Sequence, residues 1–522
     1  MRFSTAAEAP RPGKLQYSRR GAIVKLRPEE PAHPVKTADF ILEVPARLWL
    51  REVCGASATL ADVPERFLTD WAAQGIGAVW LMGVWEPSEE SRRIALEDAG
   101  LRVEYGRALP DWKDADVGGS PFAICGYDVS ADLGGREGLA AFRERLARHG
   151  LKLILDFIPN HTARDHPWVT AHPDWYVTGT EADVVADPAG WFWVTGENGP
   201  RAVAHGRDPN FPAWTDTAQL NYANSELQAA MQGELVRLTG ICDGVRCDMA
   251  MLVLAEVFER VWKRRCEEFW LQAIRAVRRA RPDFFFMAEC YWGLEERLLE
   301  MGFDAVYDKA LLDDVAAGRW PLRDRFDFPA ATHGTRVRFL ENHDEPRAAV
   351  RFDLPPHRAA AAWLLGLPSV RLLQEGQTEG RKIRTPVQLT RRTKEQPDEA
   401  VRKLYDLLLK ALTTPVVRDG RWQLLSTRSA WSGNESHHHI LGQSYEQEGR
   451  LTCIFVNAAD ARSQCWVNLG LSSPAGSEVV LRDLLSDKVY VRDGIALMLR
   501  GLYLDLEPWE AQIFECTSRP HS

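Results

Sequence analysis

Four short apolar runs of this chain end in residues that could do chemistry. Their ends carry the carboxylates Asp156, Asp248, Glu289 and Asp344, and Arg246 lies two residues before Asp248. Two carboxyl groups can cleave a glycosidic bond with retention, because one attacks the sugar while the other protonates the leaving oxygen and then activates water or an acceptor hydroxyl. A nearby arginine keeps a carboxylate ionised. These residue types indicate retaining glycoside chemistry, which requires the two reacting carboxyl groups about 5 Å apart.

The runs that carry these residues are typical of buried parallel strands. Each is a short apolar stretch bounded by polar residues. The active site of a β/α barrel lies at the carboxyl ends of its strands. Residues two apart on a strand face the same way, so Arg246 and Asp248 share a face. The runs are LILDFIPNH (153–161), GVRCDMA (244–250), FFFMAEC (284–290) and VRFLENHDE (337–345).

Taken in order, the four segments resemble the four signature regions of the α-amylase superfamily, family 13 of the glycoside hydrolases. The resemblance covers the chain from about Phe40 to its end. It implies that Asp156 and Arg246 help to bind the substrate. The matched residues are Asp156, Asn160 and His161 in the first region, Gly244, Arg246 and Asp248 in the second, Glu289 in the third, and Asn342, His343 and Asp344 in the fourth.

The resemblance implies a role for each central residue. Asp248 would be the nucleophile and Glu289 the general acid/base. Asp344 would grip the hydroxyl groups of the distorted sugar and so stabilise the transition state. His161 and His343 would hydrogen-bond the sugar in the same subsite.

The chain departs from the family pattern after Asp248 and at the end of the expected insertion. Met251 and Leu252 stand where many endo-acting amylases have a Lys-His pair. Gln219 stands where the family often has an aspartate that helps to hold a structural calcium. Calcium sites need several oxygen ligands, usually with carboxylates among them. We therefore expect no cofactor, and Asn160 either supplies one calcium ligand or only hydrogen-bonds the main chain.

Two other segments resemble those of exo-acting α-glucosidases. Gly126-Tyr127-Asp128 resembles a G-Y-D segment, and Arg384-Thr385-Pro386-Val387-Gln388 resembles an R-T-P-M-Q segment. The resemblance implies that Tyr127 lines the substrate site and that an Asp128–Arg384 pair closes it into a pocket. In the alternative register Ser120-Pro121-Phe122 supplies the stacking residue, Asp128 is a turn residue and Arg384 is a solvated charge.

The fold that we predict is α/β, a (β/α)8 TIM barrel with an insertion after the third strand and a C-terminal antiparallel β-sandwich. The 522 residues suffice for a large barrel and an appendage. Helices are expected over 135–150 and 254–280. The predicted parts are an N-terminal extension (1–39), a first barrel part (40–161), an inserted domain (162–220), a second barrel part (221–413) and the β-sandwich (414–522).

Composition narrows the functional class. Hydrophobic residues make up 45% and charged residues 26% of the chain, and the net charge is −9. No Lys/Arg-rich run favours nucleic acid, and no apolar stretch approaches the about 18 residues of a membrane span. The nine cysteines form no C-x-x-C pair, and no apolar leader is evident. We expect a cytoplasmic protein without nucleic-acid or membrane partners. Its oligomeric state does not follow from the sequence.

The predicted function is that of a retaining glycoside hydrolase acting on α-glucosidic bonds of α-glucans or maltooligosaccharides. One alternative is a transglycosidase of the same family, similar to a trehalose synthase or a maltosyltransferase. The other alternative is a non-catalytic glycan-binding barrel, which the intact set of Asp248, Glu289, Asp344 and Arg246 argues against. The sequence does not decide between hydrolysis and transfer, or between exo and endo action.

Overall fold

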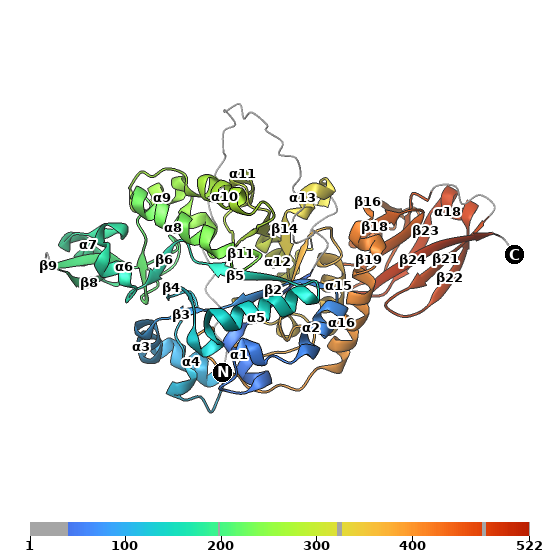
Figure 1. The fold of residues 1–522 in the computed structure, drawn as a ribbon. Coiled ribbons are helices and arrows are strands. Elements are labelled where there is room, and N and C mark those ends of the chain that lie inside the picture. The colour runs from blue at the N-terminus through green and yellow to red at the C-terminus, as the bar shows by residue number, and fades with distance from the viewer. Residues whose placement is uncertain (1–39, 197–198, 321–325, 472–476, 521–522) are drawn as a thin grey trace, which may run out of the picture. The chain divides into compact units, whose positions relative to one another are not determined.

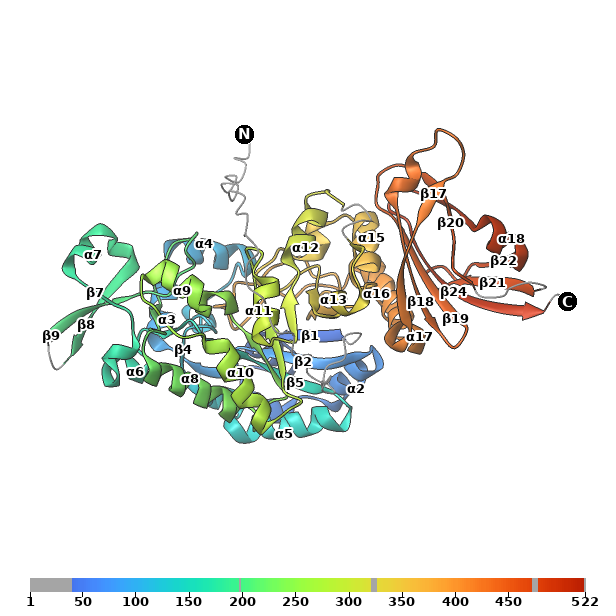
Figure 2. The same cartoon turned by 90° about the horizontal axis from the view of Figure 1, so that it is seen from above.

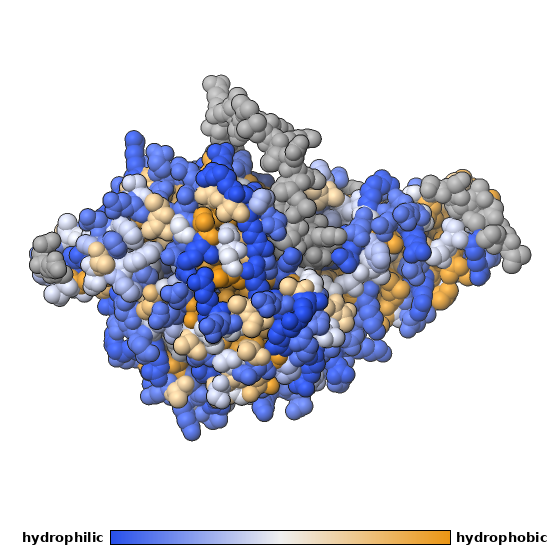
Figure 3. Space-filling model, in the orientation of Figure 1, coloured by the Kyte–Doolittle hydropathy of each residue, from blue (hydrophilic) through white to orange (hydrophobic). Residues whose placement is uncertain are grey.

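The structure of the protein is a computed structural model, and it describes residues 40–196, 199–320, 326–471 and 477–520. The predicted N-terminal extension, residues 1–39, lies outside the described residues. None of the helices in these ranges is long and apolar enough to cross a membrane. On the face shown in Figure 3, hydrophilic residues predominate and apolar residues form smaller groups between them.

Eight parallel strands close into a barrel (Figure 1). Going round the barrel, the order is β1-β15-β14-β13-β12-β11-β5-β2. This arrangement confirms the predicted barrel. The strands are β1 (Phe40–Pro45), β2 (Ile76–Met82), β5 (Lys152–Phe157), β11 (Gly244–Cys247), β12 (Phe285–Ala288), β13 (Ala305–Tyr307), β14 (Arg336–Arg338) and β15 (Val370–Gln374).

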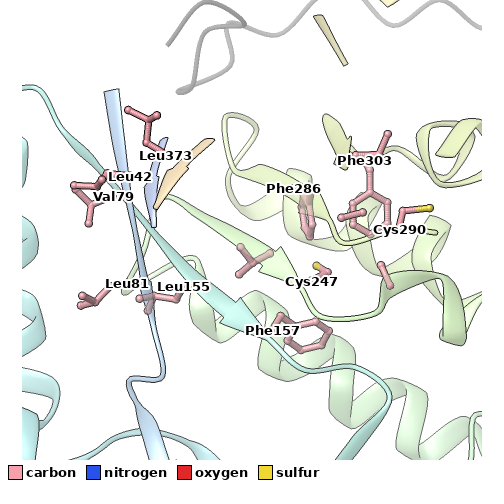
Figure 4. Close-up of a cluster of buried hydrophobic side chains, with 14 of the residues drawn as sticks. Leu42, Val79, Leu81, Leu155, Phe157, Cys247, Phe286, Cys290, Phe303 and Leu373 are labelled. Atoms are coloured by element: carbon pink, nitrogen blue, oxygen red, sulfur yellow. The ribbon is translucent and has the colours of Figure 1, made fainter. Parts of the chain in front are cut away.

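Side chains alternate between the inside of the barrel and the helices around it, as the strand pleat requires. The inner layer is a buried cluster that includes Ile41, Trp80, Ile154, Phe285 and Tyr307. The outer layer, part of which Figure 4 shows, includes Leu42, Val79, Leu155, Phe157 and Phe286. A polar side chain at or just after the end of a strand therefore faces the same way as the residue two positions earlier.

Helices surround the barrel strands, as Figures 1 and 2 show for α5, α8 and α10. The helix expected over 254–280 is in fact two helices, because Lys263 adopts a left-handed conformation (φ 56°) after α9. The barrel helices are α1 (Ala46–Cys54), α2 (Glu65–Ala73), α5 (Gly135–Arg148), α8 (Ser225–Leu238), α9 (Ala255–Trp262), α10 (Phe269–Ala280), α11 (Glu295–Met301), α12 (Lys309–Ala316), α13 (Ala330–Gly334), α14 (Ala348–Arg351), α15 (Leu354–Leu364) and α16 (Glu399–Leu412).

Two excursions leave the barrel on the side of its carboxyl ends. The first, after β2, contains β3 (Trp85–Pro87), α3 (Glu89–Glu97), α4 (Ala99–Ala108) and β4 (Ile124–Val129). The second, after β5, contains β6 (His161–Ala163), α6 (Pro167–Ala171), β7 (Thr178–Gly179), α7 (Glu181–Ala186), β8 (Trp191–Gly196), β9 (Gly199–Ala204) and β10 (Thr217–Gln219). The second excursion occupies the region of the predicted insertion, whose limits of 162 and 220 stay a prediction.

The chain beyond α17 (Pro415–Asp419) builds two antiparallel sheets that share a hydrophobic core. The six-stranded sheet has the order β16-β18-β19-β24-β21-β22, and the three-stranded sheet has the order β17-β20-β23. The elements are β16 (Arg421–Leu425), β17 (Thr427–Ser429), β18 (Ile440–Gln447), β19 (Arg450–Asn457), β20 (Ser463–Val467), β21 (Ser477–Asp483), β22 (Val489–Asp493), α18 (Gly494–Arg500), β23 (Leu502–Leu506) and β24 (Ala511–Pro520).

Candidate active site

The acidic residues predicted to react lie at the carboxyl ends of neighbouring barrel strands. Strands β5, β11 and β12 pair in register, so that Asp156 lies opposite Arg246 and Arg246 lies opposite Met287. Asp248 and Glu289 follow directly on the inward side of β11 and β12. The pleat of three adjacent strands therefore directs all four polar side chains into one mouth.

One buried guanidinium holds these carboxylates together. Arg246 Nη1 donates to Asp248 Oδ1 at 2.8 Å and lies 3.4 Å from Asp156 Oδ1. Its Nη2 donates to Glu289 Oε2 at 2.6 Å. Because the candidate nucleophile and the candidate acid bind the two terminal nitrogens of a single guanidinium, their carboxyl groups face the same small space.

Two aromatic rings lie against the guanidinium of Arg246. The Arg246 guanidinium lies 5.1 Å from the ring centre of Trp80 and 5.2 Å from that of Phe122. Phe122 also contacts the ring of His343, with 5.3 Å between centroids. Phe122 therefore stands over the site in the manner of the alternative register, in which Ser120-Pro121-Phe122 supplies the stacking residue.

Both carboxyl oxygens of Glu289, the predicted acid, accept hydrogen bonds besides the one from Arg246. Its Oε2 also accepts a hydrogen bond from Met249 N, and its Oε1 accepts one from the Tyr291 hydroxyl, both at 2.8 Å. Burial raises the pKa of Glu289, and the charges of Asp248 and Asp344 add to this rise against the opposing charge of Arg246. A pKa raised in this direction favours the protonated form that a general acid needs.

Asp248 and Asp156 have different surroundings. Burial raises the pKa of Asp248, but Arg246 opposes the rise through its charge and its hydrogen bond. Asp156 is enclosed: it accepts hydrogen bonds from Trp80 Nε1 at 3.1 Å and Gly83 N at 3.3 Å. Burial raises the pKa of Asp156 to about 7. Asp156 thus holds Trp80, Gly83 and Arg246 in place beside Asp248 and Glu289.

His343 bridges two carboxylates. Its Nδ1 lies 2.6 Å from Glu43 Oε1, and its Nε2 lies 3.0 Å from Asp344 Oδ2. Burial alone would lower the pKa of His343, but the charges of Asp344 and Glu43 outweigh it and raise the pKa well above the usual value. Burial would raise the pKa of Asp344, and the charge of His343 outweighs it and lowers the pKa to about 2. Asp344 is half-exposed, and its low pKa keeps it ionised near neutral pH.

His161 lies in β6 at the base of the inserted segment, against the ring of Trp214 at 5.2 Å. Burial lowers its pKa to about 4, so the ring is neutral. A neutral imidazole can donate one hydrogen bond to a sugar without carrying charge into the pocket.

Asn160 does not face a set of calcium ligands. Its main-chain oxygen and its Oδ1 accept hydrogen bonds from Gln219 Nε2 at 2.9 and 3.0 Å. A hydrogen-bond donor thus points at the two oxygens that a cation would use, and no carboxylate joins them in the described residues. The residues present do not fit calcium, which takes oxygen ligands only.

The structure contradicts the predicted roles of Tyr127 and Asp128. The Tyr127 hydroxyl binds the main chain of Ile158, accepting from its N at 2.9 Å and donating to its O at 3.0 Å. Asp128 is 83% exposed and lies 3.4 Å from Arg237 on helix α8. The reason is that β4 pairs with β3 rather than with the barrel. Its alternation buries Tyr127 in the core and turns Asp128 toward the outer helix.

Arg384 lies beside the site but without Asp128 as its partner. Its Nη1 donates to the main-chain oxygen of Asp344 at 3.3 Å, and its Nη2 lies 3.4 Å from Glu104 on α4. The predicted Asp128–Arg384 pair is therefore wrong. A groove of about 360 Å³ adjoins Arg384 and is lined by Glu104, Arg107, Ala108, Ile383, Arg384 and Pro386.

Two residues that contact the site, Glu43 and Tyr291, are not among those predicted from the sequence. Glu43 is fully buried on β1, and a single acid inside the apolar run FILEVP could have marked it, because charged residues are rarely fully buried without a partner. Tyr291, two residues after Glu289, gave no comparable signal. Its role depends on a turn that includes Trp292 in a left-handed conformation (φ 66°).

Comparison with known proteins finds relatives that share part of the chain. No family model matches it. It is 26% identical to the α-amylase MalA of Haloarcula japonica over 268 residues, which cover 49% of this chain and 36% of that protein. It is 25% identical to an α-1,4-glucan:maltose-1-phosphate maltosyltransferase of Burkholderia pseudomallei over 224 residues, which cover 42% and 17%. It is 32% identical to an α-glucosidase of Culex pipiens over 190 residues, which cover 33% and 30%. The chain thus spans about a third or less of the length of these curated relatives.

Solved structures match over most of the chain. The α-amylase of Geobacillus thermoleovorans, solved in complex with acarbose, superimposes with a TM-score of 0.64, 16% identity and coverage of 92% of this chain and 98% of that one. An α-amylase of Lactobacillus plantarum gives a TM-score of 0.63 at 20% identity with the same coverage. At such identities the likeness concerns the fold, which agrees with the barrel and the C-terminal sheets described above.

Proposed function

We propose that this chain, a member of the α-amylase superfamily by sequence and fold, is a retaining glycosidase that acts on the α-glucosidic bonds of α-glucans or maltooligosaccharides. The observation that carries the proposal is the sharing of Arg246 by Asp248 and Glu289 at the barrel mouth. That arrangement supplies two carboxyl groups at the barrel mouth, with an imidazolium and a third carboxylate near them.

The residues would act in two steps. In the first, an Asp248 oxygen attacks the anomeric carbon, and the bond to the leaving oxygen breaks as Glu289 gives that oxygen its proton. In the second, the Glu289 carboxylate takes a proton from water, whose oxygen attacks the anomeric carbon and releases Asp248. Asp344 and His343 would hold the ring hydroxyls throughout. The two inversions together retain the anomeric configuration.

A transglycosidase is the second candidate, in which a sugar hydroxyl replaces water in the second step. Met251 and Leu252, both buried after Asp248, speak against typical endo-amylase binding and leave this candidate open. The similarity to a maltosyltransferase points the same way. For either candidate we propose an α-glucan or maltooligosaccharide as the substrate and an α-glucosidic bond as the linkage, with water or a sugar hydroxyl as the acceptor.

The cellular setting is also proposed. The nine cysteines are all free, and most are buried. Free thiols are typical of a reducing compartment, which supports a cytoplasmic location. We expect a small-molecule or oligosaccharide substrate and no nucleic-acid partner.

One experiment tests the function and chooses between the candidates. The purified protein is incubated with maltooligosaccharides, trehalose and sucrose, the products are separated by chromatography, and their first-formed anomer is read by NMR. We expect α-anomeric products, with shorter chains alone for a hydrolase and with longer or rearranged sugars for a transglycosidase. First-formed β-anomers would contradict the retaining mechanism. Complete inactivity of the folded protein would favour the non-catalytic alternative.

A further inference from the structure

Three buried oxygens converge on one side-chain nitrogen at the base of the inserted segment. Gln219 Nε2 lies 2.9 Å from Asn160 O, 3.0 Å from Asn160 Oδ1 and 3.1 Å from Leu220 O. Asn160, Gln219 and Leu220 are all fully or almost fully buried. The amide nitrogen has two hydrogens, so it is shared among three acceptors.

Oxygens that face one another in a protein interior need a positive partner. Hydrogen-bond donors are the usual partner, and where a hard cation takes their place its affinity comes from carboxylates among its ligands. Here the oxygens are neutral, and the positive end of an amide dipole occupies the centre. Gln219 Oε1 is left without a hydrogen-bond partner, as expected if the amide is oriented by the needs of its nitrogen.

Gln219 lies where its amide can affect the position of His161. Gln219 pairs with His161 across the β6–β10 ladder, and Leu220 N donates to Asn160 O at 3.1 Å. Val177 N, inside the insertion, donates to Gln219 O at 3.0 Å. The amide therefore ties together the chain that leaves the barrel and the chain that returns to it, next to the candidate sugar-binding histidine.

We propose that the side-chain amide of Gln219 does the work of a structural cation at the base of the inserted segment, and thereby positions His161. Gln219 is a positioning residue in this proposal. Its replacement of a cation stands on the oxygen geometry alone, whereas its effect on sugar binding rests on the proposed function.

The decisive experiment replaces the Gln219 amide by a carboxylate, which can bind a metal ion. Melting of the full chain is compared with Gln219→Asp and Gln219→Glu, each with a chelator and with calcium chloride. We expect the melting temperature of the wild type to be the same in both conditions. An acidic variant brings a carboxylate to the three oxygens, so it should melt at least about 4 °C lower in chelator and recover with calcium. Isothermal titration should find one calcium ion per chain in that variant and none in the wild type.

Gln228→Asp is the matched control. The Gln228 amide also donates to main-chain oxygens, of Tyr222 at 2.7 Å and Glu267 at 3.2 Å, but no third oxygen of the described residues joins them. Its melting should not respond to calcium. A wild type destabilised by the chelator would overturn the proposal. So would a folded acidic variant that binds no calcium.

Gln219→Ala covers the case in which neither acidic variant folds. It should melt below the wild type without any calcium response, and KM for maltooligosaccharides should rise about tenfold with little change in kcat, because His161 loses its support and not its chemistry. An unchanged KM in Gln219→Ala would overturn the positioning of His161. Melting and calcium binding need no substrate, so an inactive wild type that behaves as expected in both would refute the proposed function and leave the cation replacement standing.

Discussion

The change of Glu43 to glutamine tests whether a buried acid on β1 keeps His343 charged. The substitution preserves the size of the side chain and one oxygen acceptor while it removes the negative charge. Glu43 Oε1 accepts hydrogen bonds from His343 Nδ1 at 2.6 Å and from His343 N at 3.2 Å. On its other side the ring meets Asp344 at 3.0 Å. Only a doubly protonated ring can donate to both carboxylates.

The size of the effect follows from the loss of one charged hydrogen bond. Such a bond is worth about 1.5–3 kcal/mol, and one pKa unit corresponds to about 1.4 kcal/mol. The pKa of His343 should therefore fall by about one to two units in Glu43→Gln. The folded-state pKa of His343 is raised, so its stabilising effect is complete below the unfolded pKa and disappears as the pH rises through the folded pKa. The variant should differ most from the wild type in melting temperature below about pH 6.5.

An NMR titration of the histidine side chains measures this directly, with the His343 signal assigned from its absence in His343→Asn. We expect the His343 ring to lose its proton at a lower pH in Glu43→Gln, and KM to rise at a pH where the wild type still binds substrate well. Glu341→Gln is the control, because Glu341 is a buried acid that pairs with Arg347 at 3.1 Å rather than with His343. The same His343 titration in the wild type and in Glu43→Gln would refute the reasoning.

Three further predictions concern the pocket. Asp248→Ala and Glu289→Gln should each lower kcat by a factor of about 10⁴ or more. The kcat of Asp128→Ala should stay within about twofold of the wild type, because an exposed ion pair contributes little free energy. A large fall of kcat in Asp128→Ala would show that Asp128 belongs to the site. Tyr291→Phe removes a donor to the Glu289 carboxylate, so the pKa of Glu289 should rise by about one unit and the alkaline limb of kcat/KM should move to higher pH; a shift to lower pH would show that Tyr291 stabilises the protonated acid. Arg384→Ala should raise KM about fivefold with little change in kcat, since a largely exposed contact is worth about 1 kcal/mol, and a larger loss in kcat than in KM would assign Arg384 a part in the transition state.

The residues at the carboxyl ends of the barrel strands were predicted from the sequence better than those of the surrounding loops. Asp156 and Arg246 lie in buried strands, and Asp248 and Glu289 directly follow two of them. A strand pleat leaves only two directions for a side chain, so their convergence could be inferred from spacing. The catalytic roles assigned to Asp248, Glu289 and Asp344 stay predictions. The break at Lys263 was not foreseeable from propensity, because neither glycine nor proline marks it.

The error at Asp128 has a tertiary cause. The segment Gly126-Tyr127-Asp128 matches a motif of the substrate pocket in sequence, but strand pairing determines the directions of its side chains. Trp85 and Phe157 take the Tyr127 ring into the core, at 5.4 and 5.5 Å between centroids. The pairing of β4 with β3 is a long-range choice that a local motif does not encode.

The insertion has its two ends side by side. His161 begins β6 and Gln219 ends β10, and the two residues are direct partners in an antiparallel ladder. Neighbouring partners of this kind lie about 5 Å apart, and adjacent termini are what allow one segment to be exchanged for another within a host fold. The stretch between them can thus be regarded as a replaceable cassette. Grafting a different cassette between the same two partners would change what the pocket admits while the carboxylates stay where the barrel holds them.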